Sequence, residues 1–298
     1  MRILYAASFN SGHFAPFIVE QANSICELGH EVDFFGIKGK GVWGYLSNYK
    51  LLLEKISEFK PDIIHAHYGL SGLLCNLQRK IPVVTTYHGS DINDKRVRAF
   101  SRMAMKLSAW NVFVSRRTQD IVNPKRHCSL VPCGVDTEIF MPLDNVKSDG
   151  KFVLFAGAFD NSTKNVSLAR SAVDLLNSSK DSIKLVELKG YSRVEVAELM
   201  NRASCLLLTS LAEGSPQVVK EAMSCNLPVV SVDVGDVMER LEGVENCYVT
   251  QHDARQLADA LGKVLNSGGR SNGRERILSE GLSLEMAAKK IEQIYKQL

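Results

Sequence analysis

Short apolar runs alternate with helical patterns along both halves of the chain, and this alternation most constrains the fold. A buried strand, an amphipathic helix and a second buried strand form a βαβ unit, whose two strands are parallel. Repetition of the unit predicts parallel sheets that are covered by helices on both faces. The sequence therefore predicts an α/β protein.

The predicted elements fall into two groups. In the first half we expect strands at 2–7, 31–36, 62–66, 83–87 and 111–114, and helices at 17–28 and 48–59. In the second half we expect strands at 152–156, 183–187, 206–209, 229–232 and 247–250, and helices at 168–177, 194–203, 218–225 and 284–298. The glycine- and serine-containing stretch 264–274 is predicted to be a loop, and the polar stretch 141–150 to be the seam between domains.

The most informative βαβ unit lies between residues 205 and 232. An apolar run at 205–210 is followed by the sequence EGSP at 213–216 and by a helical run that contains Glu221. A second apolar run at 227–232 completes the unit. Because open α/β sheets bind ligands outside the carboxyl ends of their strands, the segment after the first strand is a candidate binding site.

The residues of this segment suit an anionic ligand. Pro216 is a favourable first residue for a helix, and the small residues Gly214 and Ser215 let a ligand approach the backbone. The free N–H groups and partial positive charge of a helix N-terminus favour a phosphate. Glu213 and Glu221 are both expected to face the same ligand.

The segment EGSPQVVKEAMSCNLPVVSVDVG, residues 213–235, resembles the donor-sugar motif of retaining glycosyltransferases of family 4, the glycosyl transferases group 1. The family has the GT-B fold, in which two Rossmann-like, doubly wound domains face each other across a cleft. The resemblance implies that Glu213 contacts the donor sugar and that Glu221 binds the ribose of the nucleotide. Further donor-binding residues implied by the motif are Gly214, Ser215, Pro216, Gln217 and Val218.

A second part of the family pattern follows the strand at 152–156. The family has a glycine–arginine pair here and then a lysine, and both cations neutralise the donor diphosphate. Gly157 and Lys164 match, with Asn165 beside the lysine, but Ala158 stands at the arginine position. One cation is therefore missing, unless another basic residue replaces it. Without the resemblance, Lys164 would be read as an exposed lysine at the start of a helix.

His88 lies in the sequence His-Gly-Ser-Asp, which resembles a first-domain segment of the family whose histidine reaches the donor sugar. We therefore count His88, with Lys164 and Glu213, among the candidate catalytic residues. A loop histidine that bonds to the backbone is the alternative. His65 and His67 lie two residues apart and point to one side of a strand, so a metal site is a further alternative. No third ligand with suitable spacing is visible, and we expect no metal.

Weaker matches complete the candidate donor site. Gly12 lies in the first strand-to-helix loop, where the family is richer in glycine. Gly134 lies in a segment that matches one near the family's interdomain cleft, with Cys133 in place of asparagine. Gly190 and Tyr191 are expected near the nucleotide base, although the stretch 187–203 is shorter than in the family and Tyr191 is equally a surface turn residue.

Composition restricts the class of protein. The chain has 298 residues, of which 45% are hydrophobic and 23% charged, as in ordinary globular proteins. We find neither a signal peptide nor an apolar run long enough to span a membrane, and the dispersed cysteines indicate reduced thiols. We therefore expect a cytoplasmic protein, and the absence of a nucleic-acid module argues against nucleic acid as a partner.

A cluster of basic residues lies between Lys95 and Arg126, opposed only by Asp120. A solvated surface is the simplest explanation. The alternative is a face for anionic lipid or for a phosphate-bearing acceptor. Anionic lipid would place the protein at the inner membrane face. The members of this basic cluster are Lys95, Arg96, Arg98, Arg102, Lys106, Arg116, Arg117, Lys125 and Arg126.

The resemblance implies a metal-independent retaining glycosyltransferase that acts in polysaccharide biosynthesis. Residues 1–145 would form the acceptor-side domain, 146–280 the donor domain, and 281–298 a helix that packs back on the first domain. The donor would be a nucleoside diphosphate sugar, with a UDP-sugar as first choice, and the acceptor a glycan or a lipid-linked saccharide; we expect no cofactor. A sugar-nucleotide epimerase of the same fold and a non-catalytic interaction protein remain alternatives.

Overall fold

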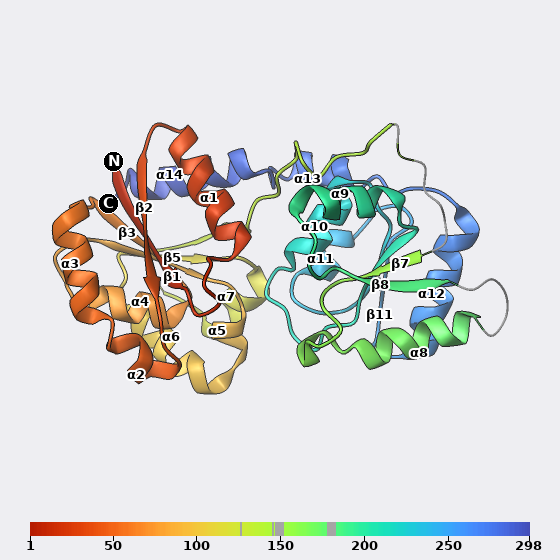
Figure 1. The fold of residues 1–298 in the computed structure, drawn as a ribbon, viewed down its shortest axis with the longest axis horizontal. Helices are drawn as coiled ribbons and strands as arrows, with labels where there is room; N and C mark the ends of the chain where they lie inside the picture. Colours follow the sequence, from red (N-terminus) through yellow and green to blue (C-terminus); the bar gives the residue numbers. More distant parts are fainter. Residues whose placement is uncertain (126, 145, 147–151, 178–182) are drawn as a thin grey trace. The chain divides into compact units, whose positions relative to one another are not determined.

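The protein is described by a computed structural model, which describes residues 1–125, 127–144, 146, 152–177 and 183–298 (Figure 1). The chain divides into two compact units. Unit 1 comprises Met1–Gly134 and Leu284–Leu298, and unit 2 comprises Val135–Ser283. This division precedes the seam expected at 141–150, half of which lies outside the described residues.

Unit 1 is built on a parallel sheet in the order β2-β1-β3-β4-β5-β6. Its strands are β1 Arg2–Ser8, β2 Glu31–Ile37, β3 Ile63–His67, β4 Val83–Tyr87, β5 Trp110–Phe113 and β6 Cys128–Leu130. The short strand β6 was not predicted, because its half-buried residues follow a polar turn and carry little periodic signal. The order reverses direction between β1 and β3, so this is the switch point at which open α/β sheets bind ligands.

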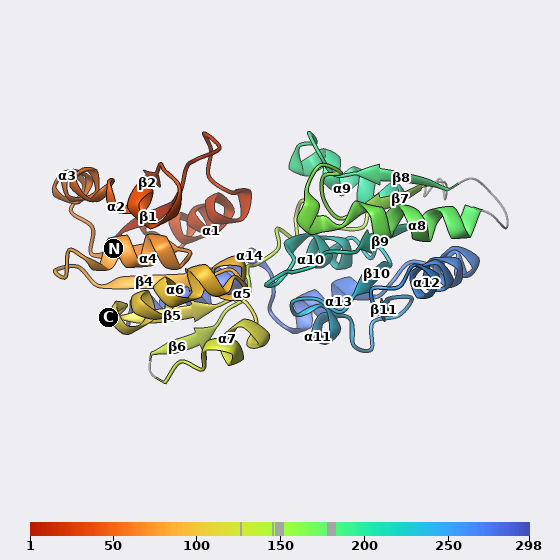
Figure 2. The ribbon, with the colours of Figure 1, turned by 90° about the horizontal axis from the view of Figure 1, so that it is seen from below.

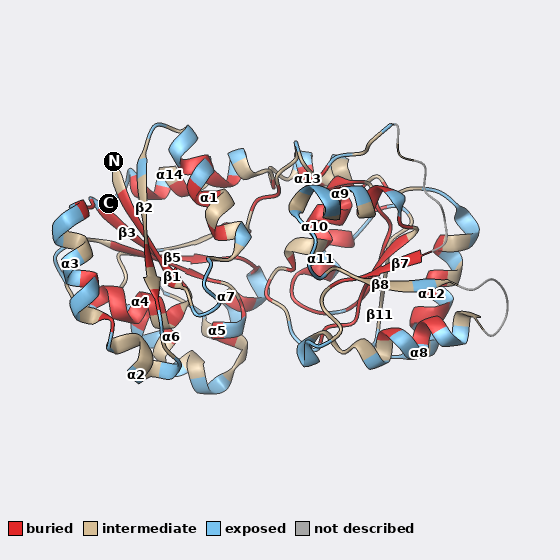
Figure 3. Ribbon diagram, in the orientation of Figure 1, coloured by how far each residue is buried: buried red, intermediate tan, exposed pale blue. Residues whose placement is uncertain are grey.

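Alternate residues of β1 belong to two separate hydrophobic cores, one on each face of the sheet of unit 1. Ile3, Tyr5 and Ala7 pack with α1 (Pro16–Glu27) and α14 (Leu284–Tyr295). Leu4 and Ala6 pack on the other face, with α3 (Tyr49–Phe59) and α4 (Gly69–Asn76). Successive side chains of a strand point to opposite faces, and helices cover both faces of β1, so both sets are buried. Figure 3 shows β1, β3 and β5 largely as buried segments.

The last helix, α14, is thus part of unit 1 although it follows all of unit 2 in the chain. It lies beside α1 (Figure 1) and buries Ala288 and Ile291 completely. The remaining helices of unit 1 are α2 Gly41–Leu46, α5 Ser90–Asn93, α6 Lys95–Leu107 and α7 Arg116–Val122.

Unit 2 repeats this topology with a parallel sheet in the order β11-β10-β9-β7-β8, and helices lie on both sides of it (Figure 2). Its strands are β7 Phe152–Phe155, β8 Lys184–Glu187, β9 Cys205–Leu208, β10 Val229–Val232 and β11 Tyr248–Thr250. The order reverses between β7 and β9. Its helices are η1 Ser162–Lys164, α8 Val166–Asn177, α9 Arg193–Arg202, α10 Gln217–Ser224, α11 Val237–Leu241, α12 Ala254–Ser267 and α13 Gly273–Ser279.

The prediction of a loop over 264–274 was wrong at both ends. Helix α12 continues to Ser267, since Val264 is buried in the core, and Gly268 ends it with a φ of 60°. Helix α13 begins at Gly273, where a Cβ would lie 2.8 Å from the Cα of Met223. Tertiary packing extends both helices into a stretch that is rich in turn residues.

Candidate active site

The switch point of unit 2 joins two loops that follow β7 and β9. The Thr209 hydroxyl donates to the backbone carbonyl oxygens of Lys164 and Asn165, at 2.9 and 3.1 Å. The Leu211 N–H donates to the Thr163 carbonyl oxygen at 2.9 Å. These bonds fix the segment that carries Lys164 against the segment that carries Glu213.

Lys164 and Glu213 form an ion pair there, with 2.7 Å between Nζ and Oε1. The side chains are 22% and 17% exposed, so the pair is accessible to a ligand yet partly shielded from water. Gly157 permits this position of the lysine, because a Cβ at residue 157 would lie 2.8 Å from the Lys164 Cγ. Asn165 takes a left-handed conformation, with a φ of 54°, that turns the chain into α8.

The loop before α10 is held by a buried polar network that the sequence did not indicate. The Ser215 hydroxyl donates to Asp236 Oδ2 at 2.8 Å, and Arg240 Nε donates to the same oxygen at 3.0 Å. The Lys220 ammonium, itself buried, donates to the Ser215 hydroxyl at 3.2 Å. The conformation of the Gly214–Pro216 backbone is thus fixed before any ligand binds, and fixed N–H groups favour anion binding.

The other motif residues lie in the loop before α10, at the start of α10 or against the hydrophobic core. Pro216 is the N-cap of α10, and Gln217 is its first residue. Val218 packs against the hydrophobic core of unit 2. Gly214 is close to Gly235, where a Cβ would lie 2.8 Å from the Gly214 carbonyl oxygen. A side chain at 235 would therefore displace the loop that precedes α10.

Glu221 is buried on α10 and pairs with Arg193, with 2.7 Å between Oε1 and Nη1. The guanidinium of Arg193 also lies 4.6 Å from the ring centroid of Phe140. The sequence did not single out Arg193. It begins α9, and the capping box between Ser192 and Glu195 fixes that helix start.

Gly190 and Tyr191 lie in the loop just before α9. Gly190 has a φ of 84°, and Tyr191 is exposed. Their contact with a nucleotide base stays a prediction. The two ion pairs, Lys164–Glu213 and Arg193–Glu221, show that unit 2 brings a cation to each of the two motif glutamates.

His88 belongs to unit 1, where it follows β4. Its Nε2 lies 3.0 Å from the Nδ1 of His67, and its Nδ1 lies 3.8 Å from the sulfur of Cys133. Both ring nitrogens therefore face protein atoms, and the rings of Phe17 and Tyr68 lie against the imidazole. A role of His88 toward the donor sugar stays a prediction.

Asp91 shapes the loop around His88. Its Oδ1 accepts from the N–H groups of His88 and Gly89, at 3.1 and 3.0 Å, and its Oδ2 accepts from the N–H of Gly69 at 3.0 Å. Burial raises the pKa of this carboxyl to about 6, although the three N–H donors act in the opposite direction. Asp91 therefore carries a structural role in the loop.

His65 and His67 are engaged within the protein. Their rings stack at 4.6 Å. His65 Nδ1 lies 2.5 Å from the Tyr295 hydroxyl, and its Nε2 lies 2.7 Å from the Thr86 hydroxyl. Burial lowers the pKa of His65 to about 3 and also lowers that of His67. Among the residues that the structure describes, no three His, Cys, Asp or Glu side chains are arranged to hold a metal ion.

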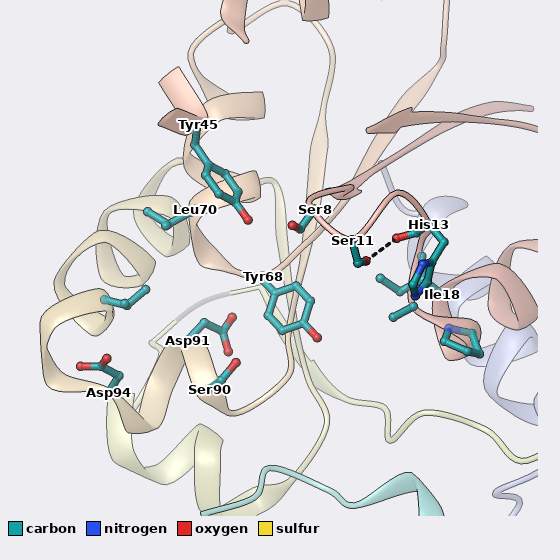
Figure 4. Close-up of a pocket in the computed structure, with 13 residues that line it drawn as sticks. Ser8, Ser11, His13, Ile18, Tyr45, Tyr68, Leu70, Ser90, Asp91 and Asp94 are labelled. Atoms are coloured by element: carbon teal, nitrogen blue, oxygen red, sulfur yellow. Dashed lines mark hydrogen bonds between the residues drawn. The ribbon is translucent and has the colours of Figure 1, made fainter. Parts of the chain in front are cut away.

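A cavity of about 610 Å³ opens at the switch point of unit 1 (Figure 4). Its polar wall consists of the side chains of Ser8, Ser11, His13, Tyr45, Tyr68, Ser90, Asp91 and Asp94. Gly12 lies in the loop that forms one side, with a φ of 80°, and no atom lies within 4 Å of the position that a Cβ would take. Hydroxyl and carboxyl groups of this kind bind the hydroxyls of a polar ligand.

Within the described parts of the chain, no helix combines the length and the apolar character needed to cross a bilayer. Two family models match the chain. The model Glycosyltransferase Family 4 matches residues 15–139, and the model Glycosyl transferases group 1 matches residues 176–267.

Relatives of known sequence are also glycosyltransferases. An uncharacterised glycosyltransferase of Methanocaldococcus jannaschii is 26% identical over 88% of this chain and 82% of its own length. TuaC of Bacillus subtilis, provisionally assigned to teichuronic acid biosynthesis, is 24% identical over 70% of this chain and 62% of its own length.

Solved structures share the fold. The sucrose-phosphate synthase of Thermosynechococcus elongatus superposes with a TM-score of 0.85 at 16% identity, covering 100% of this chain and 98% of that protein. HepE of Anabaena, in complex with UDP-glucose, gives a TM-score of 0.73 at 16% identity and covers 100% of both chains. The two matching models, the glycosyltransferase relatives and the shared fold together support a family 4-like glycosyltransferase of the GT-B fold.

Proposed function

We propose that the enzyme transfers a glycosyl group from a nucleoside diphosphate sugar to a hydroxyl of a glycan acceptor. The observation that carries this proposal is the pair of motif glutamates at the switch point of unit 2, each with a cation beside it. Glu221 would hold the ribose and Glu213 the sugar. Lys164 would exchange its carboxylate partner for the donor diphosphate.

In the proposed reaction the bond between the sugar C1 and the β-phosphate oxygen breaks, and a bond between C1 and the acceptor oxygen forms. The acceptor proton passes to the leaving phosphate on the same face, which gives the retention that the family resemblance implies. Negative charge develops on the β-phosphate, so Lys164 and the fixed N–H groups before α10 stabilise the transition state more than the ground state.

A UDP-sugar is the proposed donor, because the structurally similar HepE was solved with UDP-glucose. Arg193 is a candidate for the diphosphate cation that Ala158 does not supply. It is the basic residue at the start of α9 and already contacts Glu221.

The hydroxyl-lined cavity of unit 1 is the proposed acceptor site. A glycan fits the polar wall, and the name of TuaC is consistent with a role in polysaccharide biosynthesis. We also propose association with the inner membrane face through the basic cluster, which would give access to a lipid-linked acceptor. Arg98 is half-buried, and the other described members are exposed: Lys95, Arg96, Arg102, Lys106, Arg116, Arg117 and Lys125.

Thermal unfolding with UDP, GDP and ADP and their sugar conjugates tests the donor site. A ligand that binds the native state stabilises it by about 2.7 kcal/mol at a hundred times its dissociation constant. We expect one nucleotide to raise the melting temperature of the wild type, and Glu221→Gln to abolish most of that rise. Glu198→Gln, at an exposed glutamate of α9, is the matched control.

Loss of the ligand effect in Glu221→Gln but not in the control supports the ribose assignment, and an equal effect in both refutes it. Product analysis completes the test. A transferred sugar that requires the acceptor supports the transferase reaction, whereas an isomerised sugar nucleotide without acceptor would identify an epimerase.

A further inference from the structure

A second cavity of unit 1 lies away from the proposed acceptor site. Its volume is about 590 Å³. It is lined by the last turns of α6 and α7, the segment that follows α7, and Asn111 at the start of β5. The acceptor cavity contains the carboxyl ends of β1 and β3, so the two cavities lie at opposite edges of one parallel sheet.

The second cavity is strongly basic. Arg102, Lys106 and Lys125 line it together with His127, and none of the described lining residues is acidic. Among the described residues, the three lysine and arginine side chains make no ion pair. The carbonyl ends of α6 and α7 offset part of their charge, but each helix end carries only about half an elementary charge. A net positive charge therefore remains.

Apolar groups accompany the cations. Met105, Val122 and Pro124 contribute to the wall. Met103, Leu107 and Ile121 are large, exposed apolar side chains, and each directly adjoins a lining residue in the sequence. A free phosphate ion gains nothing from exposed apolar side chains, whereas a phospholipid places its phosphate next to glycerol and acyl carbon.

We propose that this cavity binds the phosphate of an anionic phospholipid headgroup. The apolar side chains nearby would enter the interfacial layer. The assignment of this phosphate to a lipid rests on the membrane association proposed above. The existence of a phosphate site in this cavity does not depend on the transfer reaction. Because the cavity lies at the other edge of the sheet, this phosphate is not part of the reacting acceptor.

Co-sedimentation with vesicles tests the proposal. The probes are phosphatidylcholine vesicles with and without phosphatidylglycerol. The cavity variant is Arg102→Gln with Lys106→Gln. The control is Lys95→Gln with Arg116→Gln, which removes the same charge from two exposed members of the basic cluster that do not line the cavity.

We expect binding only to phosphatidylglycerol vesicles. Each cation near an anionic surface contributes roughly a fivefold change in partition, so loss of the two cavity cations should weaken binding about 25-fold, and the control should lose clearly less. Equal losses would overturn the proposal in favour of general attraction by the basic cluster.

A second arm distinguishes the source of the phosphate. Inorganic phosphate is added to the wild type and the cavity variant, and thermal unfolding is measured. Stabilisation of the wild type alone, without vesicle binding, would overturn the lipid assignment and identify a soluble phosphorylated ligand. None of these measurements depends on transferase activity, so failure of the proposed function does not affect them.

Discussion

Unit 1 and unit 2 share one strand order, in which the second strand lies on one side of the first and the later strands on the other. At the point of reversal, unit 2 places two ion pairs, Lys164–Glu213 and Arg193–Glu221. Unit 1 places stacked imidazoles, tyrosine hydroxyls and a buried carboxyl there. The shared topology gives each unit a switch point at the carboxyl ends of its strands. The side chains at that point differ, so unit 2 suits an anionic group and unit 1 a neutral polar group.

The largest expected effect tests the Lys164–Glu213 ion pair of unit 2. Lys164→Ala removes the cation beside Glu213, and we expect kcat/KM to fall by about 10²–10³-fold, because a fixed cation acts most strongly on the charge of the leaving group. Steady-state kinetics measures this. Lys164→Arg should recover part of the activity.

Lys184→Ala is the control, since Lys184 is an exposed residue of β8 in the same unit. If Lys164→Ala retained full activity, the ion pair of unit 2 would have no part in the transfer, and the contrast between the two units would concern stability alone.

The next effect concerns the buried carboxyl of unit 1. The folded-state pKa of Asp91, about 6, lies above its ordinary value of 3.8. Between these values the native state binds more protons than the unfolded state, so this group's contribution to stability is present at low pH and is lost as the pH rises. The loss is about 3 kcal/mol, from roughly two pKa units.

Urea unfolding at pH 4 to 7 measures this dependence. Relative to Asp91→Asn, the wild type should lose stability as the pH rises from 4 to 6, and the histidines, which are present in both proteins, cancel in the difference. Asp120→Asn is the control for removal of an exposed carboxylate. A constant difference between wild type and Asp91→Asn across the range would refute the raised pKa.

The smallest effect concerns the hydrogen bonds that the Tyr295 hydroxyl makes with His65 and Tyr5. Tyr295→Phe removes the hydroxyl that lies 2.5 Å from His65 and 3.3 Å from the hydroxyl of Tyr5. A buried polar atom without its partner costs about 1–3 kcal/mol, so the free energy of unfolding of unit 1 should fall by that amount.

Hydrogen exchange of amides in each unit separates local from global effects. Tyr248→Phe, a half-buried tyrosine of unit 2, is the matched control. Faster exchange in unit 1 alone supports the assignment, whereas unchanged exchange in Tyr295→Phe would show that His65 finds another partner.

The sequence predicted what depends on local pattern. The apolar runs at 83–87 and 229–232 became strands with these same bounds, because a buried parallel strand reads as a continuous apolar run. The glutamate motif placed Glu213 after β9 and Glu221 in α10. Both are short-range features.

Long-range partners were not predictable from the sequence. Arg193 contacts Glu221 across 28 positions of the chain, and Tyr295 contacts His65 across 230. No periodicity or spacing links such pairs. The same limitation led us to consider a metal for His65 and His67, whose nearest polar partners come from β4, the loop after it and α14.

The contribution of α14 to unit 1 also has a consequence for synthesis of the chain. The ribosome releases β1 to β6 first, but the face of β1 that carries Ile3 and Tyr5 is only partly covered, by α1, until Ile291 and Tyr295 emerge. Unit 2 is contiguous, so its core can close earlier. The half of the protein that is made first is therefore finished last, and its exposed apolar face must be protected from aggregation while translation continues.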